Sequence, residues 1–116
     1  MKIRVLFALA AFAAAASIAS AQDNNNQMMG HDMGGQAMME ANEKMMSAMQ
    51  GMQPSGSTDK DFATMMIDHH QGAIDMAKVE LEHGEDPQLK AMAEKIMDAQ
   101  EQEIAEFEAW LAENGQ

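Results

Sequence analysis

The sequence predicts an all-α fold: an antiparallel helical hairpin with a shorter methionine-rich helix packed on it, forming a small helical bundle. Apolar residues recur at steps of three and four over residues 58–83 and 87–113, which is the period of an amphipathic helix. Only three residues separate these two segments, so the helices must run antiparallel. Methionines at similar steps in residues 36–52 predict the third helix.

The N-terminus has the pattern of an export signal over residues 1–21. Lys2 and Arg4 precede an apolar run over residues 5–16, and the Ala-Ser-Ala of residues 19–21 suits a cleavage site. This run is shorter than the roughly 20 residues of a membrane span, so we expect no stable membrane span. Removing 21 of 116 residues leaves 95, enough for one small domain. We therefore expect a periplasmic or secreted protein.

The composition is acidic and rich in methionine. The formal net charge is −12, and loss of the basic Lys2 and Arg4 would make it −14. This charge disfavours nucleic acid and anionic lipid as partners and would attract cations, although it could serve solubility alone. The absence of cysteine excludes disulfides and thiolate ligands. All but Met1 of the 15 methionines follow the predicted signal, and thioethers both fill cores and bind soft metals.

Residues 22–35 are polar, contain glycine and lack any apolar period, so we expect a flexible arm ahead of a helical domain over residues 36–116. The arm contains four soft or borderline donors, namely Met28, Met29, His31 and Met33. A mobile cluster of this kind could wrap a soft ion, or the arm could be a tail without function.

A first helix is expected over about residues 36–52, followed by a break at residues 53–57 that contains Pro54 and Gly56. Four of its methionines follow steps of seven, four and three: Met38, Met45, Met49 and Met52. Such a stripe predicts a packing face, with a ladder of metal ligands as the alternative.

The second and third helices carry start and stop signals. Thr58 or Asp59 can cap the second helix, with Asp61 in a capping-box position, and Gly84 would supply a left-handed turn after residue 83. A third helix should begin at Pro87 and continue to about residue 113.

The centre of the second helix carries the clearest chemical pattern. Met65, His69 and Met76 lie at steps of four and seven, and Met66 with His70 forms a second pair four residues apart. Thioether sulfur and imidazole nitrogen are the donors that a soft ion such as Cu(I) or Ag(I) prefers. The donor types at this spacing therefore favour a soft-metal site on this helix, with Cu(I) as the leading ion.

The third helix should present polar groups to that site. Its apolar stripe is interrupted by Gln100 and Glu103, which a short hairpin turn brings level with His69 and His70. A glutamate in such a seam needs a hydrogen bond, an opposite charge or a metal. Glu103 is therefore either part of a polar lock with the imidazoles or a metal ligand or ring-orienting group. Glu80 is a weaker candidate of the same kind.

Catalysis has little support, and we expect no enzyme. No serine or threonine adjoins either histidine in a nucleophile pattern, and no Gly-rich phosphate loop is present. A di-iron carboxylate bundle would need Glu-x-x-His on two helices, whereas only Glu80 and His83 have that spacing.

The segment of about residues 59–112 resembles the domain of unknown function 305 family. The resemblance rests on Phe62-x-x-Met65-Met66-Ile67-Asp68-His69-His70-Gln71, then Asp86-Pro87-x-Leu89, Ile96, Gln100, Glu103-Ile104 and Trp110-Leu111. It implies a ferritin-like helical fold, and it implies copper binding in the periplasm, since the family includes exported copper-binding proteins of the CopM type. Asp68 and Gly72 depart from the usual pattern, and Gly72 would let a neighbouring helix or an ion approach closely.

Three hypotheses follow. The leading one is a periplasmic binder of Cu(I), and of Ag(I), for copper buffering, resistance or transfer to a periplasmic partner. The second is a structural or interaction module whose histidines, Gln100 and Glu103 form a buried polar network without a metal. The third is a small metal-dependent enzyme. We also expect homo-oligomers that complete a four-helix arrangement, because three helices leave apolar methionine surface uncovered.

Overall fold

The computed structural model describes residues 17–115, with side chains from residue 33 onward. It contains three helices: α1 (Ser17–Gly51), α2 (Thr58–His83) and α3 (Pro87–Asn114). No strand occurs within residues 17–115, so the predicted all-α fold is confirmed. No helix in this range is long and apolar enough to cross a membrane.

The starts of α2 and α3 follow local sequence signals. Ser57 caps α2 by accepting a hydrogen bond from the Lys60 amide at 3.4 Å, one residue before the expected cap. Asp86 caps α3 by accepting from the Leu89 amide at 2.8 Å, and Pro87 occupies the first turn as predicted.

The end of α2 differs from the sequence prediction in its geometry. Gly84 follows His83 as expected, but its φ of −69° and ψ of 153° are extended rather than left-handed. A Cβ at this position would lie 2.1 Å from Oε1 of Glu80. Gly84 therefore provides room for the Glu80 carboxylate, and its extended backbone leads directly to the cap of α3.

The predicted flexible arm of residues 22–35 is helical instead. α1 begins at Ser17, nineteen residues before the expected start at residue 36. Gln27, Met28 and Met29 are good helix formers, whereas the three asparagines and three glycines of residues 22–35 are poor ones, so helix propensity does not account for this extension. Of the predicted export signal, residues 1–16 lie outside the described residues.

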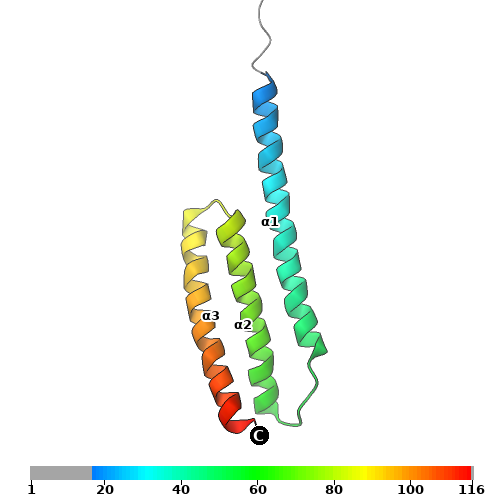
Figure 1. The fold of residues 1–116 in the computed structure, drawn as a ribbon, viewed down its shortest axis with the longest axis vertical. Helices are drawn as coiled ribbons and strands as arrows, with labels where there is room; N and C mark the ends of the chain where they lie inside the picture. The colour runs from blue at the N-terminus through cyan, green and yellow to red at the C-terminus, as the bar shows by residue number, and fades with distance from the viewer. Residues whose placement is uncertain (1–16, 116) are drawn as a thin grey trace, which may run out of the picture.

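The helices form a layer with α2 in the middle (Figure 1). α2 packs against both neighbours, whereas α1 and α3 make no close contact within the described chain. The buried positions are few and mostly small: Ala41, Ala63, His70, Gly72, Ile74, Ala77 and Ala93. Because the layer is one helix thick, each helix keeps an open side, and the candidate site lies on such a side.

α1 runs antiparallel to α2 in a register fixed by two glycines. A Cβ on Gly72 would lie 2.4 Å from Sδ of Met45, and a Cβ on Gly34 would lie 2.9 Å from Cβ of His83. Gly72 therefore admits the neighbouring helix, as the sequence suggested. Met45 acts as a packing residue, which supports the packing reading of its stripe.

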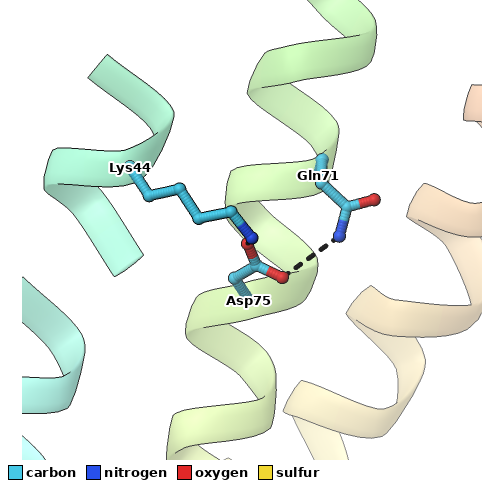
Figure 2. A network of polar contacts seen from close by, with 3 residues as sticks. All are labelled: Lys44, Gln71 and Asp75. Atoms are coloured by element: carbon cyan, nitrogen blue, oxygen red, sulfur yellow. Dashed lines mark hydrogen bonds and ion pairs between the residues drawn. The ribbon is translucent and has the colours of Figure 1, made fainter. Parts of the chain in front are cut away.

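An ion pair adds to this interface (Figure 2). Nζ of Lys44 lies 3.1 Å from Oδ2 of Asp75, and Nε2 of Gln71 donates to Oδ1 of the same carboxylate at 3.1 Å. Gln71, which follows the two histidines, thus fixes Asp75 for its contact with α1. Lys44 is 72% exposed, so the pair is worth at most about 1 kcal/mol.

Candidate metal site

The two adjacent histidines of α2 have different surroundings. His70 is buried at 6% relative exposure and points toward α3, whereas His69 is exposed. Their ring centroids lie 6.1 Å apart with an interplanar angle of 62°. The pair therefore offers one imidazole held by the protein interior and one on the surface beside it.

His70 contacts Glu103 across the hairpin. Nε2 of His70 meets Oε2 of Glu103, although 33 residues separate the two in the sequence. The prediction that the middle of α3 returns to the level of the histidines is therefore confirmed. The Glu103 side chain is 52% exposed, so the acid lies at the edge of the seam rather than inside it. No hydrogen bond joins Gln100 to either histidine in the described structure.

Phe107 contacts the buried imidazole, and Phe62 packs on Phe107. The ring of Phe107 stands edge-on to that of His70 at 5.6 Å and 86°, and it meets Phe62 edge-on at 5.8 Å and 76°. Edge-to-face pairs of this kind favour one ring orientation. Neither aromatic contact was predicted from the sequence. Phe107 follows Glu103 by four residues, about one helical turn, and that spacing was the available signal.

Nδ1 of His70 is buried without a hydrogen-bond partner, the only such side-chain atom found in residues 33–115. A carboxylate can only accept, so its contact places the proton of a neutral ring on Nε2. The lone pair of the imidazole then lies on Nδ1. An unsatisfied buried polar atom costs about 1–3 kcal/mol, and a bound ion would offset that cost.

The methionine candidates lie beside the histidines on the open side of α2. Gly72 and Asp75 face α1, and His70 faces α3. With a turn of about 100° per residue, Met65, His69 and Met76 fall between these directions, and Met66 lies near the α3 edge. Met65 is 37% exposed, while Met66 and Met76 are half-buried. These thioethers therefore share one side of the helix with His69.

The remaining candidates are less well placed. Met33 is 60% exposed on α1, and the side chains of Met28, Met29 and His31 lie outside the described ones. Glu80 lies against Gly84 at the hairpin turn. Within the described residues, no three side chains among His, Asp and Glu are close enough to hold a metal ion.

The fold and site define a small all-α protein with a His–Glu contact between the arms of its hairpin. A family model described as a domain of unknown function (DUF305) matches residues 8–111, and the chain belongs to this family. The match includes all of α1 and so begins well before residue 59, where the resemblance was expected to start. No curated protein matches the chain.

Proposed function

We propose that this protein binds a soft metal ion, Cu(I) foremost and Ag(I) by the same chemistry, outside the cytoplasm. It would buffer copper there, limit its toxicity or pass it to a transfer partner. The donors gathered on one part of α2 support this proposal, because thioether and imidazole groups are the ligands that soft ions prefer. The signal-like residues 1–21 support export, and the charge of −12 favours attraction of cations.

The state of His70 is the single observation that carries the proposal. Its Nε2 faces a carboxylate, its Nδ1 is buried without a partner, and its ring is held by Phe107. Histidines that ligate metals are commonly oriented by a carboxylate on the other ring nitrogen. Glu103 would then act as the orienting group and His70 would offer Nδ1 to the ion.

The other ligands would come from His69, Met65, Met66 and Met76. These residues fit a soft ion in donor type, since two imidazoles and three thioethers supply no hard oxygen ligand. Met side chains have three rotatable bonds, so they can close on an ion without movement of the helices. Met28, Met29, His31 and Met33 would form a looser loading site toward the start of α1.

A competition titration of the mature chain with a Cu(I) chelator tests the proposal. Replacing Met65 and Met76 together by leucine keeps side-chain volume and should weaken Cu(I) binding by about tenfold or more. The matched control replaces Met39 and Met46, which are exposed on α1, and should leave the affinity unchanged. No measurable uptake by the unmodified chain would end the proposal, and equal losses in both variants would remove the assigned ligands.

The loading site needs a separate measurement. Replacing Met28, Met29 and Met33 by leucine should lower the number of Cu(I) ions bound at excess metal. The affinity of the tightest Cu(I) site should stay unchanged. An unchanged number would remove these residues from the proposal.

A structural or interaction module is the second candidate function, and the same contact favours it. His70, Glu103, Phe62 and Phe107 form a continuous contact between the arms of the hairpin, which can fix helix register without a metal. In this case the methionines would be an adaptable partner-binding face.

Glu103→Gln separates the two candidates. The neutral amide keeps an acceptor for Nε2–H but weakens a charge-assisted bond, so metal-free stability should fall by about 1 kcal/mol or less. If Glu103 also orients a ligand, Cu(I) affinity should fall by about tenfold. Urea unfolding without metal and the chelator titration measure the two effects independently. A stability loss with unchanged Cu(I) affinity would favour the structural module.

A further inference from the structure

The end of the hairpin opposite its turn contains a cavity that the copper proposal does not use. This cavity has a volume of about 680 Å³ and is lined by Asp59, Phe62, Ala63, Glu103, Glu106, Phe107 and Trp110. Its volume lies within the range of small-molecule sites, about 300–1,000 Å³. Two of these residues, Glu103 and Phe107, also contact His70 at the candidate metal site.

The lining combines two kinds of group. Phe62 and Phe107 stand edge-on at 5.8 Å, and Trp110 adds a third aromatic side chain from the last turns of α3. Three carboxylates, those of Asp59, Glu103 and Glu106, lie around these rings, and no lysine or arginine lines the cavity. Aromatic faces and carboxylates both attract cations, whereas a purely apolar ligand would gain nothing from the acids.

We infer that this cavity binds a small organic cation, an ammonium ion with an apolar shell such as a quaternary amine. The aromatic rings would contact its methyl or methylene groups and attract its charge, and the carboxylates would balance that charge at the rim. Phe62 is 57% exposed and Trp110 is 37% exposed, so the rings are accessible to a ligand from solvent. The strongly negative net charge adds long-range attraction.

Trp110 provides a direct reporter, because it is the only tryptophan in the chain. Choline is the probe, and its neutral isostere dimethylbutanol, with carbon in place of nitrogen, is the matched ligand control. Choline should change the Trp110 emission saturably, and the alcohol should bind about three- to thirtyfold more weakly. The full chain without added metal is used, so the result does not depend on copper binding.

Two variants test the lining residues. Glu106→Gln removes one carboxylate at the cavity and should weaken choline binding about two- to fivefold without affecting the alcohol. Glu101→Gln makes the same charge change at an exposed position of α3 outside the cavity and should have little effect. Phe62→Leu should weaken choline binding by about threefold or more. If Phe62→Leu loses its helical signal, the comparison of choline binding by Glu106→Gln and Glu101→Gln still tests the inference.

Three outcomes would overturn the inference. One is an emission change that does not saturate with choline, and another is equal binding of the alcohol. The third is an equal effect of Glu101→Gln and Glu106→Gln, which would reduce the attraction to net charge alone.

Discussion

At the scale of single residues, the contact between His70 and Glu103 joins the two helices of the hairpin at the candidate site. Helical spacing correctly predicted that Glu103 lies level with the histidines, because a short turn fixes the register of a hairpin. The exposure of Glu103 and the burial of Nδ1 of His70 depend on how closely α2 and α3 pack. Spacing along one helix contains no information about that distance.

Asp61 shows a second difference at this scale. The sequence placed it in a capping box with Thr58, but it accepts a hydrogen bond from the Ser55 amide at 2.8 Å. Hydrogen bonds from Ser55, through its side chain and then its backbone amide, hold the pKa of Asp61 below its ordinary value. Asp61 therefore ties the loop before α2 to the first turn of that helix.

We predict an acid-dependent loosening of this loop. A carboxyl whose pKa is lowered by folding stabilises the folded state when ionised, so its contribution is present above about pH 4 and is lost as the pH falls through the lowered pKa. Ser55→Ala should raise the pKa of Asp61 toward its ordinary value. NMR titration of the Asp61 carboxyl, in the unmodified chain and in Ser55→Ala, measures this. An unchanged pKa in Ser55→Ala would contradict the assigned cause.

At the scale of helices, the hairpin and residues 36–51 of the first helix were predicted, and the earlier part of the first helix was not. α2 and α3 have apolar periods, caps and a proline that all indicate the same boundaries, and these agree with the structure to within a residue. Residues 17–33 precede the contact of Gly34 with His83 and have no apolar period, so periodicity gave no signal there.

The contact of α1 with α2 gives a prediction for Gly72→Ala. A Cβ at this position would lie 2.4–2.7 Å from three atoms of Met45, so α1 must shift. Overpacking costs about 1–3 kcal/mol, whereas alanine favours the helix by about 1 kcal/mol. We expect a net loss of up to about 2 kcal/mol in urea unfolding.

The double variant Gly72→Ala with Met45→Ala provides the control. Truncating Met45 to alanine removes its Sδ and Cγ, two of the three atoms that would meet the new Cβ, so the alanine at position 72 should then cost less. Additive losses in the double-mutant cycle would show that the two residues do not meet in solution.

At the scale of the whole molecule, the layer of three helices explains why so many large apolar side chains remain exposed. The exposed set comprises Met33, Met39, Met46, Phe62, Met65, Leu89, Met92, Ile96 and Trp110. α1 and α3 do not cover each other's open sides within the described chain. The expected homo-oligomer stays a prediction, and sedimentation at high micromolar concentration, with a strict monomer as the contrary result, addresses it.

The start of α1 offers the sharper measurement of that prediction. α2 ends at His83, which lies against Gly34, so residues 22–33 extend past the hairpin (Figure 1). Without a packing partner, the amides of residues 22–33 should have a free energy of opening near zero. The amides in the middle of α2 should have a free energy of opening of about 3 kcal/mol or more. Hydrogen exchange of the chain at low protein concentration measures both segments in one sample. Protection of residues 22–33 that rises with protein concentration would show that a second copy covers this helix, and strong protection at every concentration would contradict the absence of a partner.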